Sequence, residues 1–174
     1  MIDNTLRELI YGKGAHVDPI ACIEDISAEL AARRVAGYPH SIWQIVLHMD
    51  YWMDYELRKI AGENPHNPDH AIESWPEHAD PANAAQSAQA NSQWQTARQH
   101  FIDDLAQFAK FADSDTATLD KLVADFDTAK KPRQTSVRAV LRQITAHNSY
   151  HAGQIALLRR QAGAWPPERG GDTW

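Results

Sequence analysis

Apolar residues recur at helical spacing over three long stretches of the chain, and start and stop signals bracket each of them. The clearest stretch runs from Ser41 to Gly62. Ser41 and Gln44 form a Ser-x-x-Gln capping box, and a glycine is a common end signal for a helix. One face of this stretch carries Ile45, His48, Trp52 and Tyr55. The pattern therefore predicts an amphipathic helix.

A second helix is predicted after Asp80 and Pro81, because these residues combine an N-cap with a proline at the first helical position. It extends to about Phe111, and its apolar stripe consists of Trp94, Ala97, Phe101, Leu105 and Phe108. The last helix begins near Thr135 or Ser136 and ends at Gly163. Its inward stripe consists of Val137, Leu141, Ile144, Ile155 and Leu158. Both stripes predict helices that pack against a shared core.

The remaining stretches are less regular. Gly12 and Gly14 interrupt the first forty residues and Pro19 suggests a restart, so the first helix is predicted in two pieces. Residues 63–81 hold four prolines and three histidines without a sustained period. They are predicted to form a long connection that could fold over one end of the molecule. No strand pattern competes with helix. The expected fold is all-α, a single domain of residues 1–174 built as an up-and-down four-helix bundle.

Composition agrees with a soluble globular protein, since 43% of the 174 residues are apolar and 23% are charged. No membrane partner is expected, because no apolar window is long enough to span a bilayer. Charged residues near Met1 argue against a signal peptide, so a cytoplasmic location is expected. The net charge of −6 and the absence of a basic stripe exclude nucleic acid as a partner. The single cysteine, Cys22, excludes an internal disulfide and a thiolate zinc site.

Three histidines lie on the predicted inward faces. His147 and His151 are one turn apart on the last helix, and His48 lies on the apolar face of another helix. Facing helices are where bundles build metal sites, so the three imidazoles could bind one divalent ion. They could equally be three core histidines, each with its own hydrogen-bond partner. Because the chain has nine histidines, spacing alone leaves both interpretations open.

The other histidines have weaker claims to a site. His66 and His70 repeat the same spacing, but prolines flank them, so they are expected in an exposed loop. His100 falls off the stripe of its helix and is expected to face solvent. His40 precedes a helix cap and is expected at the surface. His16 could reach a site near the helix ends, although nothing local requires this.

Two segments resemble a known family. Residues 41–48 (Ser-Ile-Trp-Gln-Ile-Val-Leu-His) and 147–155 (His-Asn-Ser-Tyr-His-Ala-Gly-Gln-Ile) are similar to the signature helices of the DinB-like superfamily, in particular its YfiT-like metal-dependent hydrolases. The resemblance implies a four-helix bundle, commonly a homodimer. It also implies a zinc or nickel ion held by His48 on the second helix and by His147 and His151 on the fourth. Members of that family include transferases that join a low-molecular-weight thiol to an electrophile.

Three neutral imidazoles leave a divalent ion with its full charge and open positions, which is typical of a catalytic site. The leading hypothesis is therefore a metal-dependent enzyme that acts on a small molecule, by thiol transfer to an electrophile or by hydrolysis. The alternative is a non-catalytic metal- or ligand-binding module. Trp52 and Tyr55 are the expected walls of the substrate site. No general base or other catalytic residue is assigned, because spacing places no carboxylate beside the histidines.

Overall fold

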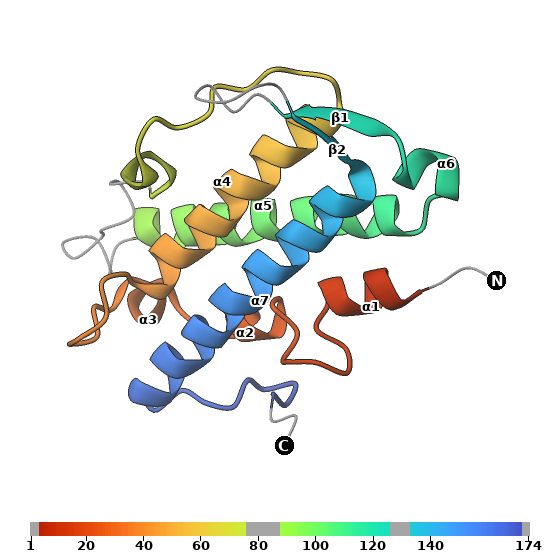
Figure 1. Cartoon of the computed structure of the whole chain (residues 1–174). Coiled ribbons are helices and arrows are strands. Elements are labelled where there is room, and N and C mark those ends of the chain that lie inside the picture. Colours follow the sequence, from red (N-terminus) through yellow and green to blue (C-terminus); the bar gives the residue numbers. More distant parts are fainter. Residues whose placement is uncertain (1–3, 76–87, 126–132, 172–174) are drawn as a thin grey trace.

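Three long helices dominate the computed structural model, which describes residues 4–75, 88–125 and 133–171. Helix α4 spans Ile42–Ile60, α5 spans Ala88–Ala112 and α7 spans Val137–Gln161. Each of the three helices contacts the other two. Figure 1 shows α4 and α7 side by side, with α5 crossing behind them. The protein is therefore mostly helical, as the apolar pattern predicts.

Local capping explains why the predicted ends of α4 and α7 are confirmed. The Ser41 hydroxyl accepts from the Gln44 amide at 3.2 Å, and the Gln44 side chain accepts from the Ser41 amide at 3.2 Å. Gly62 follows α4 with a φ of +92°, a conformation that favours glycine. Ser136 caps α7 through the Ala139 amide. The predicted start of α5 at Asp80 lies outside the described residues.

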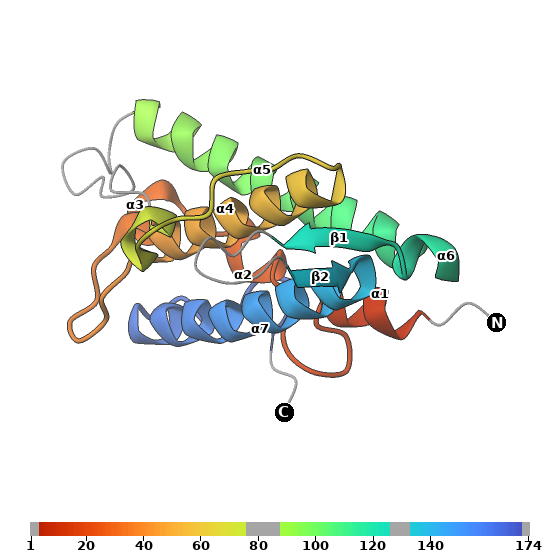
Figure 2. The same cartoon turned by 45° about the horizontal axis from the view of Figure 1, so that its top comes forward.

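The direction of the helices differs from the prediction. In Figures 1 and 2, α4 and α5 run the same way and α7 runs antiparallel to α4. After α4 the chain leads back towards the first half of that helix, where the 3-10 helix η1 (Ala71–Ser74) contacts it. An up-and-down order would reverse direction at every step, so that part of the prediction is wrong. The long connection allows the return before α5 begins.

The first helix is broken more often than predicted. Three short helices, α1 (Thr5–Ile10), α2 (Ala21–Glu24) and α3 (Ala28–Ala32), replace the two expected pieces. The extra break falls at Ser27, whose side chain accepts from the Leu30 amide and so caps α3. Helix α1 packs on α5 and α7, α2 on α7, and α3 on α4 and α5. The three short helices thus pack against α4, α5 and α7.

A small hairpin corrects the expectation that the chain has no strands. Strands β1 (Leu122–Asp125) and β2 (Arg133–Ser136) pair antiparallel, with Leu122 opposite Ser136. The short helix α6 (Thr116–Leu119) precedes them. Each strand has only four residues, too few for an alternating pattern to stand out in the sequence. The hairpin leads directly into α7.

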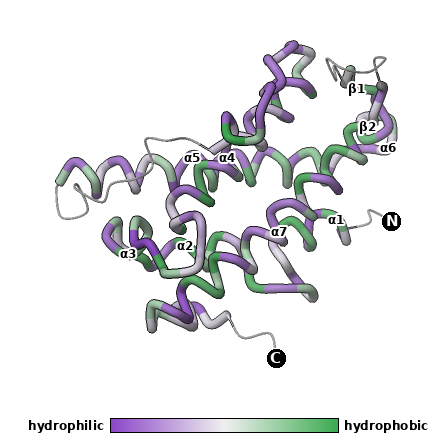
Figure 3. Tube along the Cα trace, turned by 60° about the vertical axis from the view of Figure 1, so that its left-hand side comes forward, coloured by the Kyte–Doolittle hydropathy of each residue, from purple (hydrophilic) through white to green (hydrophobic). Residues whose placement is uncertain are grey.

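The core lies between the long helices, and Figure 3 shows apolar residues distributed along all of them. The five residues of the predicted α5 stripe are buried. Cys22 is fully buried as well, and burial raises the pKa of its thiol to about 12. Within the described ranges, no helix is long and apolar enough to cross a membrane.

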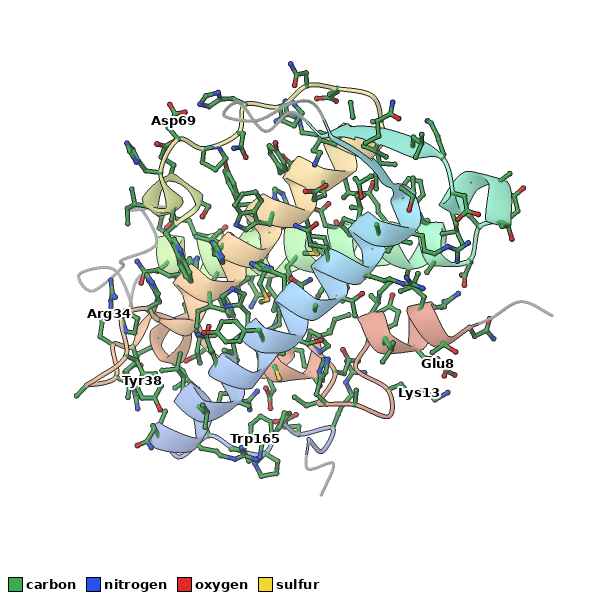
Figure 4. The ribbon with its side chains drawn as sticks, viewed as in Figure 1. Glu8, Lys13, Arg34, Tyr38, Asp69 and Trp165 are labelled. Carbon is green, nitrogen blue, oxygen red and sulfur yellow. The ribbon has the colours of Figure 1, made fainter. Side chains whose placement is uncertain are left out.

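A buried arginine attaches the C-terminal tail to the helices. Arg159 is 2% exposed and donates to the Asp25 carboxylate at 2.7 and 3.1 Å and to the Cys22 carbonyl at 2.9 Å. Its Nε donates to the carbonyl of Ala164 in the tail. Figure 4 shows Trp165 below the C-terminal part of α7, where its ring faces the arginines of that helix. Polar contacts thus join this end of α7 to the end of α2 and to the tail.

Candidate metal centre

Three histidines converge between the antiparallel helices α4 and α7. One ring nitrogen from each of His48, His147 and His151 lies within 4.8 Å of the corresponding atoms of the other two. His48 and His151 are buried and His147 is half-buried. Among the residues that the structure describes, this is the only such group of possible metal ligands. Packing of two helix faces thus brings together rings about one hundred residues apart in the sequence.

An oxygen atom faces the Nδ1 atom of each ring. His48 Nδ1 lies 2.8 Å from the Ser74 carbonyl and His151 Nδ1 lies 2.7 Å from Gln154 Oε1. His147 Nδ1 lies 3.3 Å from Oδ1 of Asn148, whose amide nitrogen donates to Met53. Carbonyl and amide oxygens only accept, so Nδ1 carries the proton in each neutral ring. The three Nε2 atoms are then left with free lone pairs.

Two of those lone pairs face each other. The Nε2 atoms of His48 and His147 are 3.2 Å apart, and neither has a proton to share when both Nδ1 atoms donate. A shared cation removes this conflict. Two nitrogens that bind one ion at roughly 2.0–2.1 Å in tetrahedral geometry lie about 3.3 Å apart. The partnered Nδ1 atoms are also usual for metal-binding histidines. The donor set therefore fits a divalent metal ion.

Burial keeps these rings neutral at ordinary pH. It lowers the pKa of His48 and of His151 to about 4, although a hydrogen bond to an oxygen acts in the opposite direction in each case. Neighbouring histidines lower both values further. Burial also lowers the pKa of His147. Since only neutral imidazole binds a metal, the group is ready to act as ligands without losing protons.

Aromatic rings surround the cluster. Trp52 meets His48 edge-on at 6.5 Å between centroids, and Tyr55 packs against Trp52 in the same way at 5.4 Å. On α7, the exposed Tyr150 ring lies edge-on to His151 at 5.1 Å. The predicted helix face thus places Trp52 beside His48, with Tyr55 packed on the indole of Trp52. Both side chains are at least partly buried.

Sequence reasoning missed two residues of the connection after α4 that contact the site, and it misplaced His40. Ser74 and Trp75 contact His48 from the connection after α4, and no local pattern marks them because that segment is irregular. His40 was expected at the surface. It is half-buried, and its ring stacks on Trp75 at 3.6 Å between centroids. The reason is the same, because the stacking partner of His40, Trp75, comes from this irregular connection.

Four further histidines of the described residues, His16, His66, His70 and His100, lie apart from the cluster. His16 Nδ1 lies 2.7 Å from the Val17 carbonyl and its Nε2 lies 2.7 Å from the Ser149 hydroxyl, so both ring nitrogens have partners elsewhere. Ser149 is on α7 between the two candidate ligands but points away from them, towards the loop before α2. His66, His70 and His100 are exposed, as predicted.

Comparison with known families agrees with this architecture. Residues 20–155 match the DinB superfamily, a range that contains all three histidines and most of the three long helices. No curated protein and no solved structure matches the chain. Since the family match covers well over half of the sequence, the chain belongs to the DinB superfamily.

Proposed function

We propose that this protein is a metal-dependent enzyme acting on a small molecule, with a zinc or nickel ion bound by His48, His147 and His151. The observation that carries the proposal is the convergence of three Nε2 atoms whose rings are each fixed by an oxygen on Nδ1. Histidine nitrogens suit both metals. Three neutral side chains are the number of protein ligands typical of catalytic sites rather than closed structural ones.

A bound ion would supply Lewis-acid chemistry, lowering the pKa of a water or thiol bound to it. The protein's own residues supply orientation. Ser74, Asn148 and Gln154 hold the planes and tautomers of the three rings, so the ligand atoms need little rearrangement. The half-buried Trp52 offers apolar surface beside the cluster for the carbon skeleton of a substrate, and the buried Tyr55 ring packs against it. No carboxylate is assigned as a general base.

Two reactions suit such a site. In thiol transfer, the sulfur of a low-molecular-weight thiol bonds to an electrophilic carbon, the leaving group departs with its electron pair, and the thiol proton passes to solvent. In hydrolysis, the oxygen of water takes the place of the sulfur. The two make different demands, since an added thiol is a substrate in the first and a competing ligand in the second. A non-catalytic metal- or ligand-binding module is the alternative.

An assay of the metal-loaded protein distinguishes these possibilities. A chloro-dinitrobenzene or a bimane serves as the electrophile, with and without glutathione, mycothiol or bacillithiol. Turnover that needs both metal and thiol supports transfer. Turnover without thiol, inhibited when thiol is added, supports hydrolysis. Stoichiometric metal binding without turnover of either kind supports the binding module, and absence of metal binding contradicts the proposal as a whole.

We further propose that the chain is one domain in which α1, α2 and α3 together take the place of the first helix of a four-helix bundle. We also propose a homodimer. Tyr150 and Leu157 support the dimer, because they are exposed apolar residues seven positions apart on one face of α7, at 66% and 47% exposure. Light scattering at micromolar concentration tests it, and a monomer mass would contradict it.

A further inference from the structure

One tryptophan lies between two histidine rings at the candidate metal centre. The indole of Trp75 stacks on His48 at 3.8 Å between centroids with an interplanar angle of 4°. Its other face stacks on His40 at 3.6 Å and 8°. The same indole meets His151 edge-on at 5.8 Å. A residue from the connection after α4 therefore touches two of the three candidate ligands.

The residue before it holds His48 in a second direction. The Ser74 carbonyl accepts from His48 Nδ1 at 2.8 Å, in the plane of the ring, whereas Trp75 presses on the face of the ring. An in-plane hydrogen bond limits where Nε2 points, and a stacked ring limits how the imidazole plane can turn. Together the two contacts restrict both motions available to a histidine side chain on a helix.

The segment that provides these contacts is held by its own hydrogen bonds. Glu73 accepts from the backbone amides of His70 and Asp69, at 3.1 and 3.2 Å. The hydroxyl of Ser74, which is 2% exposed, donates to the Ala71 carbonyl at 2.8 Å. Figure 4 places Asp69 at the start of this turn, above the first half of α4. The turn thus presents Ser74 and Trp75 in a fixed arrangement.

The far side of the stack lies just before the start of α4. His40 directly precedes Ser41, the N-cap of α4, and Gln44 closes the capping box with Ser41. Trp75 therefore stacks between the residue that precedes the N-cap of α4 and a histidine on that helix. The stack thus has His40 at one end and a candidate ligand, His48, at the other.

We propose that Trp75 is a positioning residue that sets the metal affinity of the site by fixing the ring of His48, with Ser74 as its in-plane partner. The inference rests on the proposed metal site and deepens it, because it assigns a role to a segment outside the helices that carry the ligands. Loss of an outer partner of a metal-binding histidine typically weakens metal affinity by about 10- to 100-fold. The bound ion should in turn hold the Ala71–Trp75 segment in place.

The test measures Co²⁺ and Ni²⁺ affinity by chelator competition for the wild type, Trp75→Ala, Trp75→Phe and the control Trp165→Phe. Trp165 lies at the far end of α7, so its loss removes a tryptophan without touching the cluster. We expect Trp75→Ala to weaken binding by about 10- to 100-fold and Trp75→Phe, which keeps a stacking ring, by much less. Trp165→Phe should bind as the wild type does.

Fluorescence provides an independent readout, because a transition-metal ion bound beside His48 should quench a stacked indole. We expect Ni²⁺ to quench part of the wild-type emission, and that quenched part to shrink in Trp75→Phe but not in Trp165→Phe. Failure of wild-type binding would refute the metal site itself. Tight binding in the wild type with equal affinity in Trp75→Ala would overturn only the role of Trp75. If Trp75→Ala does not fold, the fluorescence of Trp75→Phe provides the test. Ni²⁺ quenching equal to that of the wild type would then overturn the role of Trp75.

Discussion

Helix α4 has an ionisable cluster on each of two opposite faces. Towards α7, His48 meets two other histidines. Towards α5, Asp50 and Asp54 face His100, Asp103 and Asp104 around a cavity of about 310 Å³. Burial displaces the pKa of groups on both faces. It lowers that of His48 to about 4 and raises those of Asp50 and Asp104 to about 7 and 6.

The two clusters differ in how their polar atoms are oriented. Each histidine has one nitrogen fixed by an oxygen and the other directed at a common point. On the acidic face, Asp50 Oδ1 is buried and has no hydrogen-bond partner among the described residues. The nearby carboxylates raise the pKa of Asp50 and Asp104 further. A displaced pKa by itself therefore indicates burial. A candidate site is indicated by ring nitrogens that point to one place and whose rings are held by hydrogen bonds.

The largest expected effect is on metal affinity, which should depend on the histidine face of α4 and not on its acidic face. His151→Ala should weaken Zn²⁺ binding by at least about 100-fold, because one of three protein ligands is lost. Asp104→Asn, on the other face, should leave binding unchanged. Chelator competition at neutral pH measures both. Equal weakening in the two variants would show that the acidic face takes part in binding and would break the comparison.

The second prediction concerns the metal-free protein in acid. The folded pKa of His48 and His151 lies below the unfolded value near 6.5, so the unfolded chain binds more protons between about pH 6.5 and pH 4. Stability should therefore fall as the pH drops through that window, by roughly 2 kcal/mol or more. Urea unfolding at several pH values measures this. A His48→Gln, His151→Gln variant should lose most of the slope, and an unchanged slope would count against the prediction.

The acidic face should respond to pH in the opposite direction. The folded pKa of Asp50 lies above its unfolded value of 3.8, so its contribution to stability is present below that value and is lost as the pH rises towards 7. Asp50→Asn removes the buried charge. It should stabilise the protein at pH 8 by about 1 kcal/mol, since partial exposure reduces the full effect. The same urea series checks it, and destabilisation at pH 8 would contradict it.

The smallest effect concerns a buried group in neither cluster. Burial raises the pKa of the Cys22 thiol to about 12, so the thiolate that reacts is nearly absent at pH 8. Native protein should react with a disulfide reagent far more slowly than protein in urea. Rapid labelling of the folded chain would contradict this prediction, because it would show that the Cys22 thiol is reactive although burial raises its pKa.

Local signals account for what the sequence could predict. The capping box at Ser41 and the N-cap at Ser136 are determined by neighbouring residues, so both helices and the inward placement of His48 and His151 could be inferred from them. Inference from the sequence failed where distant segments meet. The stack of His40 on Trp75 depends on how an irregular connection returns along α4. The hairpin and the direction of α5 depend on tertiary packing in the same way.

X-ray absorption of the full-length chain loaded with zinc or nickel tests the central claim most directly. The expected result is one tightly held ion per chain with three imidazole nitrogens at roughly 2.0–2.1 Å, and loss of that ion in a His48→Ala, His147→Ala, His151→Ala variant that still folds. Sub-stoichiometric metal in the wild type, or a spectrum unchanged in the triple variant, would contradict it.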